Sequence, residues 1–208
     1  MPDIAIVGAG GHGREVLDIV EALIAAGHSY SFVGFIDDHG GDTALLSRRG
    51  AGVVSSTADP LPDGCTYVVG IGDGSARARL AQVYGSAAAT LVHPLASVAS
   101  DNILGPGVVL AAGARVTTNV HLGAHTHLNV NAVVSHDCRL GQACTLSPGT
   151  MLNGNVTVGD GAFFGTNAVV TPGITVGARA VIGAGAVVIH DVPDDATVVG
   201  VPARRVDR

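Results

Sequence analysis

A histidine and an aspartate are adjacent in the chain at His136 and Asp137. They occupy the third and fourth positions of a six-residue repeat, described below, and these positions place both side chains outside the fold. A histidine can accept a proton near neutral pH, and a neighbouring carboxylate orients and stabilises the imidazolium that forms. The pair is therefore a candidate general base. A solvated surface pair is the alternative that the residues alone leave open.

A glycine-rich loop follows the first apolar segment of the chain. Gly8, Gly10 and Gly13 fit the G-x-G-x-x-G pattern, in which glycines allow a phosphate to reach a helix N-terminus. Asp37 and Asp38 end the next apolar segment, where a carboxylate can accept a hydrogen bond from a ribose or a base. The loop predicts a nucleotide or nucleotide-sugar site. A full dinucleotide site and a purely structural turn are the alternatives.

The other histidines and the cysteines form no recognisable metal-binding pattern. No two of the nine histidines have the H-x4-H spacing found in metal-binding β-helix trimers. The three cysteines show no C-x-x-C spacing. We expect no metal requirement, and the cysteines favour reduced thiols in a cytoplasmic protein.

Half of the chain follows a strict period of six residues. Every sixth residue from Val92 to Val188 is apolar, which gives 17 positions without a break, and 16 of them are aliphatic. Small residues recur four positions after these anchors, as at Ala114, Ala132 and Cys138. A period of six suits neither an α-helix nor an alternating strand. It predicts a triangular prism with one short strand and one corner per hexad, which is an all-β left-handed parallel β-helix over residues 89–208.

The first 88 residues have a different pattern. Apolar segments at 4–7, 31–36 and 67–71 predict three strands, and two segments with helical spacing lie between or after them. This order predicts a small α/β Rossmann-like βαβ domain with a parallel sheet. The segment is too short to hold the second half of a dinucleotide-binding domain.

Composition excludes several classes of partner. The formal net charge is −6, which argues against a nucleic-acid partner. All 11 basic residues are arginines, so a phosphate site must use arginine, backbone N–H groups or helix N-termini. No apolar run reaches 18 residues, and we expect no membrane span.

The two halves together resemble a known bacterial family. The segments that carry the resemblance are the opening IAIVGAGGHGREVLDIV, FVGFIDD, VVGIGDG, the hexads, NAVVSHDCRLG and the closing VVGVPARRV. They are similar to the hexapeptide-repeat acyltransferases, and specifically to the family of nucleotide-amino-sugar N-acetyltransferases and sialic-acid O-acetyltransferase-like proteins. The resemblance covers nearly the whole chain.

The resemblance implies a homotrimer with acetyl-CoA bound between neighbouring β-helices. It assigns His136 as the catalytic base and Asp137 as the carboxylate that raises its basicity. Many members have glutamate at that position, so the shorter Asp137 predicts a looser or water-mediated contact with the imidazole. Coenzyme contacts map to Thr166 and Ala184, and also to Thr145, where many relatives have histidine.

The nucleotide-sugar site implied by the resemblance comprises residues of the N-terminal domain. These are Gly10, Gly11, His12, Asp37, Asp38 and Gly72. The implied activity is acetyl-CoA-dependent N-acetylation of a nucleotide-activated amino sugar for surface-glycan biosynthesis. O-acetylation of a sugar of the sialic-acid type is the first alternative, because Thr145 departs from the family pattern near the acceptor. A non-catalytic trimeric scaffold is the second.

Overall fold

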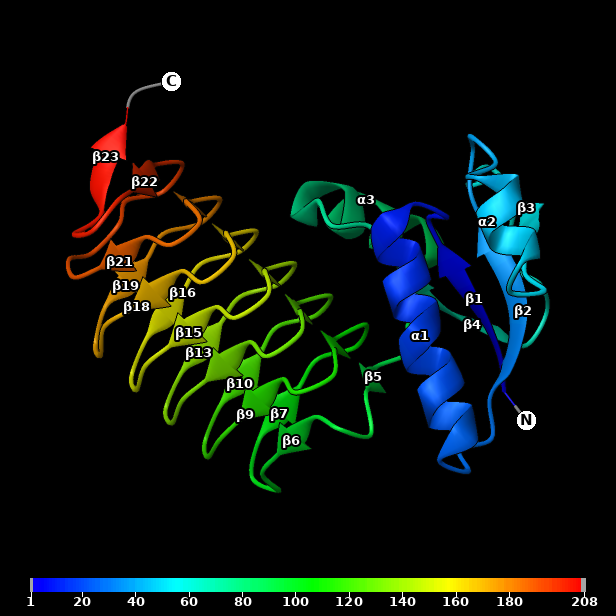
Figure 1. Ribbon diagram of the computed structural model, residues 1–208, viewed down its shortest axis with the longest axis horizontal. Helices are drawn as coiled ribbons and strands as arrows, with labels where there is room; N and C mark the ends of the chain where they lie inside the picture. Colours follow the sequence, from blue (N-terminus) through cyan, green and yellow to red (C-terminus); the bar gives the residue numbers. More distant parts are fainter. Residues whose placement is uncertain (1, 207–208) are drawn as a thin grey trace.

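The computed structural model describes residues 2–206, and its two units lie side by side (Figure 1). The N-terminal unit is a parallel sheet of order β3-β2-β1-β4 with helices packed against it. Its elements are β1 (Asp3–Val7), α1 (Gly11–Ala25), β2 (Ser31–Ile36), α2 (Thr43–Ser47), β3 (Val53–Ser55), β4 (Cys65–Val69) and α3 (Gly74–Tyr84). This is the predicted Rossmann-like arrangement, and the predicted boundary near residue 88 falls between α3 and the first strand of the prism.

The central strand β1 explains where a ligand could enter this unit. Residues 4–7 are fully buried, as expected for a parallel strand covered on both faces. The chain leaves β1 toward β2 on one side and later returns to β4 on the other. The carboxyl ends of β1 and β4 therefore flank the point where strand order reverses, which is the usual binding crevice of such sheets.

Seventeen two-residue strands form the parallel β-helix. Their bounds are β5 (Leu91–Val92), β6 (Ser97–Val98), β7 (Ile103–Leu104), β8 (Val109–Leu110), β9 (Arg115–Val116), β10 (His121–Leu122), β11 (His127–Leu128), β12 (Val133–Val134), β13 (Arg139–Leu140), β14 (Thr145–Leu146), β15 (Met151–Leu152), β16 (Thr157–Val158), β17 (Phe163–Phe164), β18 (Val169–Val170), β19 (Thr175–Val176), β20 (Val181–Ile182) and β21 (Val187–Val188). The second residue of every strand is one of the predicted anchors. The fold predicted from the six-residue period is thus confirmed strand by strand.

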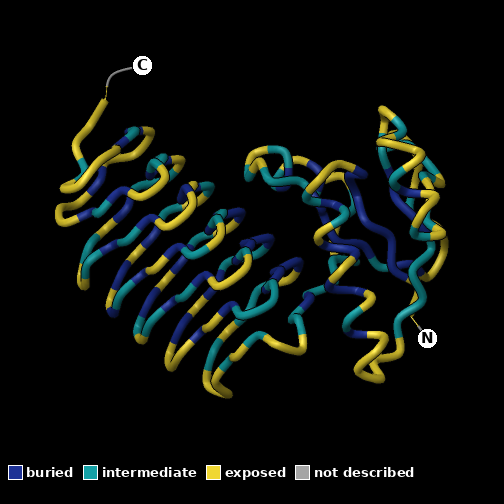
Figure 2. The backbone as a smooth tube through the Cα atoms, viewed as in Figure 1, coloured by how far each residue is buried: buried dark blue, intermediate teal, exposed yellow. Residues whose placement is uncertain are grey.

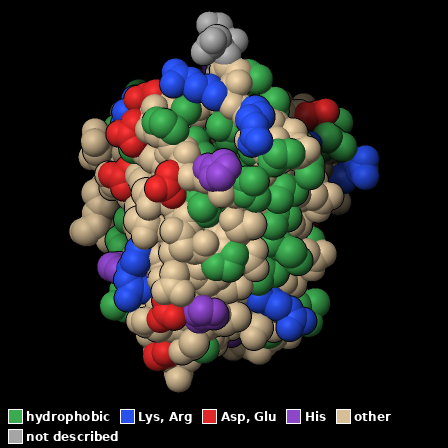
Figure 3. Space-filling model, turned by 90° about the vertical axis from the view of Figure 1, so that its left-hand side faces the viewer, with side chains coloured by type: hydrophobic (Ala, Val, Ile, Leu, Met, Phe, Trp, Pro, Cys, Tyr) green, Lys and Arg blue, Asp and Glu red, His purple; other side chains and the backbone are tan. Residues whose placement is uncertain are grey.

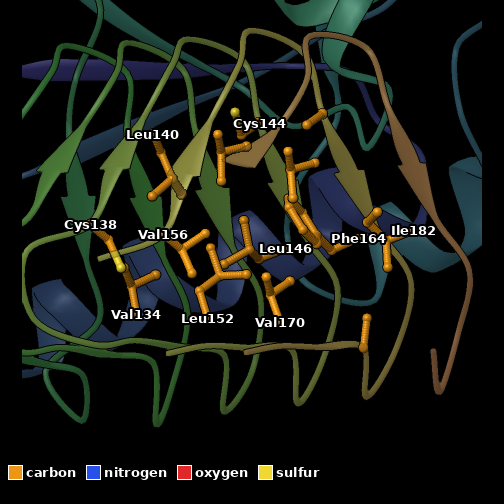
Figure 4. Packing of buried hydrophobic residues seen from close by; sticks show 14 of the residues in the cluster. Val134, Cys138, Leu140, Cys144, Leu146, Leu152, Val156, Phe164, Val170 and Ile182 are labelled. Atoms are coloured by element: carbon orange, nitrogen blue, oxygen red, sulfur yellow. The ribbon is translucent and has the colours of Figure 1, made fainter. Parts of the chain in front are cut away.

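Three parallel sheets form the faces of the prism, and aliphatic side chains fill its interior. The sheets contain the parallel strand orders β19-β16-β13-β10-β7, β21-β18-β15-β12-β9-β6 and β20-β17-β14-β11-β8-β5, and the last sheet is extended by two further strands. Each strand pairs with the strand 18 residues away, as His127 does with Thr145. Anchors such as Leu146 and Leu152 point into the interior, and Cys138 and Cys144 occupy small positions there (Figure 4). Exposed positions concentrate at the turns (Figure 2).

Two further strands follow the last coil. Strand β22 (Thr197–Val199) extends the eight-stranded sheet, and β23 (Arg204–Val206) pairs with it in the antiparallel direction. Strand β23 therefore covers the edge of β22 to which a next parallel strand would pair. Within residues 2–206 no helix is long and apolar enough to cross a membrane.

Two details differ from the sequence expectation. The third expected strand, 67–71, is β4, which spans Cys65–Val69. Gly70 N still donates a hydrogen bond to Val7 O, and the chain bends at Gly72. The polar stretch between β2 and β4 also contains α2 and β3, which were not predicted. Asp42 is the N-cap residue of α2, and its carboxylate accepts a hydrogen bond from Leu45 N.

Candidate active site

His136 and Asp137 form a direct hydrogen-bonded pair at one corner of the prism. His136 Nδ1 lies 2.8 Å from Asp137 Oδ2. The contact is direct, in contrast to the looser or water-mediated bond expected from the short aspartate side chain. The left-handed backbone of Asp137, with φ of 63°, turns its carboxylate back toward the preceding ring. Both side chains are open to solvent, with 55% of His136 and 42% of Asp137 exposed.

The electrostatics favour an ionised carboxylate in this pair. The hydrogen bond from His136 and a second one from the Asn119 amide hold the pKa of Asp137 below its usual range. Nδ1 then carries the hydrogen that faces Asp137, so Nε2 is left to accept a proton from outside. The pair can therefore act as a base.

Gly154 leaves room for the imidazole ring. It stands one coil above His136, and a Cβ atom at this position would overlap the His136 ring atoms Cε1 and Nε2. The ring consequently lies against bare backbone at the corner between β12 and β13. Gly154 was not predicted as a site residue. Its separation of 18 residues from His136 indicates a contact only when the length of one coil is known.

The glycine loop leads into α1 as predicted, and Gly10 is its N-cap residue. Asp37 holds the loop, because its carboxylate accepts a hydrogen bond from Ala9 N at 2.8 Å. Asp38 accepts hydrogen bonds from the backbone N and the hydroxyl of Thr57. Asp37, Asp38 and Thr57 line an open cavity of about 300 Å³ together with Arg79. The predicted site residues Asp37 and Asp38 are thus together at the carboxyl ends of the strands.

His12 and Gly72 lie where the N-terminal unit meets the prism. His12 Nε2 is 3.0 Å from Nδ1 of His127, and its Nδ1 is 3.0 Å from Glu15 Oε2. His127 is 2% exposed, and burial holds its pKa well below the usual range, so the ring is neutral. Gly10 and Gly11 lie beside His12 at the start of α1. Gly72 instead faces the prism through its carbonyl oxygen.

Arg77 is the main polar link between the two units, and sequence reasoning did not single it out. Its guanidinium is fully buried. It donates hydrogen bonds to the oxygen atoms of Ile71, Gly72, His125, Ala143, Cys144 and Thr145. Burial lowers the pKa of Arg77 to about 10, which still leaves it charged at neutral pH. The sequence places Arg77 in a short Arg-rich helical segment, and no other pattern in the sequence indicates its role.

The three predicted coenzyme residues are not brought together. Thr145 lies under α3, where its hydroxyl accepts from Arg77 at 2.8 Å and donates to Gly72 O at 3.1 Å. Thr166 and Ala184 follow β17 and β20 and stack on one corner, with Gly185 N bonded to Thr166 O. We therefore keep Thr166 and Ala184 as coenzyme candidates and assign Thr145 to the contact between the units.

The predicted base and the predicted nucleotide site are on opposite sides of one chain. The N-terminal unit contacts the eight-stranded sheet, as the pairs His12–His127 and Arg77–Thr145 demonstrate. His136 lies at the corner between the other two sheets, following β12 and preceding β13. One chain does not therefore bring the dyad to its own nucleotide cavity. Over residues 2–206, no cluster of three or more histidine, cysteine or acidic side chains could hold a metal ion.

Comparisons with known proteins agree with both halves of the fold. The model of the PglD N-terminal domain matches residues 3–84, and that of the hexapeptide repeat of succinyl-transferase matches 155–189. A perosamine N-acetyltransferase from Caulobacter crescentus, solved as a histidine-to-asparagine variant with CoA and GDP-perosamine, is 34% identical with a TM-score of 0.86. PerB from the same organism, solved with the same two ligands, is 35% identical with a TM-score of 0.85. That comparison covers 99% of this chain and 97% of the other. The chain belongs to this family of hexapeptide-repeat acyltransferases.

Two further relatives extend the family. The acetyltransferase domain of PglB from Neisseria gonorrhoeae, solved with acetyl coenzyme A, is 32% identical with a TM-score of 0.88, covering 99% of each chain. The GDP-perosamine N-acetyltransferase of Escherichia coli O157:H7 is 32% identical over 145 residues, which is 63% of this chain and 61% of that enzyme. Family membership confirms the predicted enzyme class, an acyltransferase, and the expected relation to nucleotide-amino-sugar N-acetyltransferases.

Proposed function

We propose that the protein transfers the acetyl group of acetyl-CoA to the amino group of a nucleotide-activated amino sugar, as a step in surface-glycan biosynthesis. The observation that carries the proposal is the His136–Asp137 pair, which leaves Nε2 free at the surface of a family-typical acyltransferase fold. The family relatives support the donor and the acceptor class, because they are solved with CoA, acetyl coenzyme A or GDP-perosamine. The C. crescentus perosamine N-acetyltransferase was solved as a variant in which asparagine replaces a histidine.

In the proposed reaction the sugar amine attacks the thioester carbonyl carbon. A C–N bond forms and the C–S bond breaks, while His136 Nε2 takes the proton that the amine loses. The same proton then passes to the departing thiolate of CoA, which restores the neutral imidazole. The Asp137 carboxylate orients the ring through Nδ1 and offsets the charge of the transient imidazolium.

We further propose that the working unit is a homotrimer with shared active sites. His136 and the residues Thr166 and Ala184 lie along opposite edges of the sheet β21-β18-β15-β12-β9-β6. A neighbouring chain is needed to bring the two edges together in one groove. Enclosure between two chains would also exclude water from the base and hold the thioester at attack distance.

An apolar outer surface on that sheet supports the trimer. Val133, Met151, Val169 and Val187 precede buried anchors and therefore point outward, and Met151 is 48% exposed. Hydrophobic side chains gather along one side of the prism (Figure 3). Burying such a surface between copies of the chain is favourable, and threefold symmetry closes the assembly.

The test is a thiol-release assay on the full chain with acetyl-CoA and a panel of acceptors. The panel contains GDP-, UDP- and dTDP-linked amino sugars, the matching hydroxy sugars and sialic acid. We expect CoA release only with amino sugars, and mass spectrometry should locate the acetyl group on nitrogen. An O-acetylated product would support the alternative acceptor class, and no release with any acceptor would favour a scaffold.

The role of His136 is tested with a matched control. His136→Ala should lower kcat by roughly 10²–10⁴-fold, the usual contribution of a positioned base. His190-Asp191 repeats the same dipeptide three coils further along the same corner, but Asp191 Oδ1 accepts a hydrogen bond from Thr175 N. His190→Ala should therefore retain the wild-type rate. Equal activity of both variants would remove His136 from the mechanism.

A further inference from the structure

A ladder of polar side chains runs along the corner that carries the catalytic pair. Asp101, Asn119 and Asp137 are separated by 18 residues each and occupy equivalent positions on three successive coils. The Asp101 carboxylate accepts a hydrogen bond from Asn119 N at 3.1 Å. Asn119 Nδ2 in turn donates to Asp137 Oδ1 at 2.6 Å. The other carboxylate oxygen of Asp137 is the one that meets His136.

Arg139 fixes the direction of the Asn119 amide. Its guanidinium donates to Asn119 Oδ1 at 3.2 Å and to the Asn119 backbone carbonyl at 2.6 Å. A flipped amide would place an oxygen against the Asp137 carboxylate and an NH2 group against the Arg139 cation, and both contacts would be repulsive. The charges on either side therefore leave one orientation, in which the NH2 group faces Asp137.

The backbone conformation at residue 119 does not by itself explain why an asparagine is present there. Its φ of 54° is left-handed, which glycine or aspartate would also tolerate at this corner. The equivalent left-handed positions on the following coils of the same corner hold Asp137, Asn155 and Gly173, so the backbone here does not require a side-chain donor. The contact that distinguishes the Asn119 side chain is therefore its hydrogen bond to the Asp137 carboxylate.

We propose that Asn119 is a positioning residue for acetyl transfer, holding the Asp137 carboxylate in the orientation that accepts the His136 Nδ1 hydrogen. The inference rests on the proposed function of His136. An aspartate has only two side-chain torsions, and a bond to one oxygen fixes where the other oxygen points. Asn119 therefore acts on the imidazole through Asp137 and does not touch the substrate.

The test is a double-mutant cycle in the full-length enzyme with its amino-sugar acceptor. Asn119→Gly retains the left-handed backbone and removes the donor, and we expect kcat to fall about 3- to 10-fold with an unchanged KM for acetyl-CoA. In the Asp137→Asn background the same substitution should have no further effect, because the group it positions has changed. Asn119→Asp, which retains the shape but cannot donate, should lose at least as much activity as Asn119→Gly.

A spectroscopic measurement separates positioning from a structural effect. The titratable and charged groups around Asp137 are His136, Arg139 and Asp101. The hydrogen bond from Asn119 is one of the interactions that lower the pKa of Asp137. The carboxyl-carbon NMR titration of Asp137 should move to higher pH in Asn119→Gly, while the melting temperature changes little. Wild-type kcat in both Asn119 variants, or an undiminished loss in the Asp137→Asn background, would overturn the inference. Full activity of His136→Ala would instead reject the proposed function on which it rests.

Discussion

Arg77 and Thr145 join the two units of the chain through a partly buried hydrogen bond of 2.8 Å between Nη2 and Oγ1. The same guanidinium satisfies five backbone carbonyl groups from both units. A buried cation is costly unless its donors are paired, and here carbonyl oxygens supply the pairing. The N-terminal unit is therefore held to the prism by polar contacts as well as by apolar packing.

Replacing Arg77 with methionine should destabilise this contact strongly. The methionine leaves buried carbonyl groups without donors, and we expect a loss of about 3–5 kcal/mol in the free energy of unfolding. Urea denaturation measures the loss, and hydrogen exchange should locate it at the amides near β14 and α3. Arg79→Met, on the same helix at an exposed position, should change stability by less than about 0.5 kcal/mol. Equal effects of the two substitutions would contradict the role of Arg77.

Gly154 should be required for the orientation of the base. In Gly154→Ala the new methyl group overlaps the His136 ring, which must rotate away from its contact with Asp137. Because His136 is exposed, the ring can move without unfolding the coil. We expect a kcat loss of about tenfold or more with a nearly unchanged melting temperature. Steady-state kinetics should also find no additional loss when Gly154→Ala is added to His136→Ala.

The buried imidazole of His127 should make stability depend on pH. Burial lowers its pKa in the folded protein, and the nearby charges of Arg77 and His12 act in the same direction. Below about pH 6.5 the unfolded chain takes up a proton that the folded chain does not, so stability falls as pH falls. The slope from this residue reaches about 1.4 kcal/mol per pH unit.

Thermal unfolding between pH 8 and pH 5 tests this dependence. His127→Gln should have a shallower decline in melting temperature toward low pH than the wild type. His121→Gln, at an exposed position on β10, is the matched control and should retain the wild-type slope. A wild-type slope in His127→Gln would mean that other groups govern the dependence.

The prism was predictable because its signal is repeated along half of the chain. Each anchor from Val92 to Val188 must fit the same narrow interior, and a single period therefore determines the strands, the corners and the outward position of His136. The N-terminal strands were predictable from their apolar runs. Helix α2 and β3 were not, because they lie in a polar, glycine-rich stretch whose few apolar residues show no clear period.

The sequence indicated candidate site residues but not how they are arranged. His136, Asp137 and the glycine loop have local patterns that indicate their chemistry. The contacts of Asn119 and Gly154 with the pair depend on an 18-residue stacking that links different coils. Thr145 was expected near the coenzyme. In the structure α3 packs against the prism, and Arg77 donates a hydrogen bond to the Thr145 hydroxyl. These contacts are set by tertiary structure and leave no local pattern.

The most direct test of the shared active site is complementation between two inactive variants. His136→Ala removes the base, and Thr166→Trp should block the coenzyme at the other edge of the sheet. Each variant alone should be inactive, whereas trimers refolded from an equal mixture should regain about a quarter of the wild-type activity, because one interface in four then pairs an intact base with an intact coenzyme site. Native mass spectrometry confirms that mixed trimers have formed. Mixed trimers with no more activity than either parent would contradict a site built from two chains.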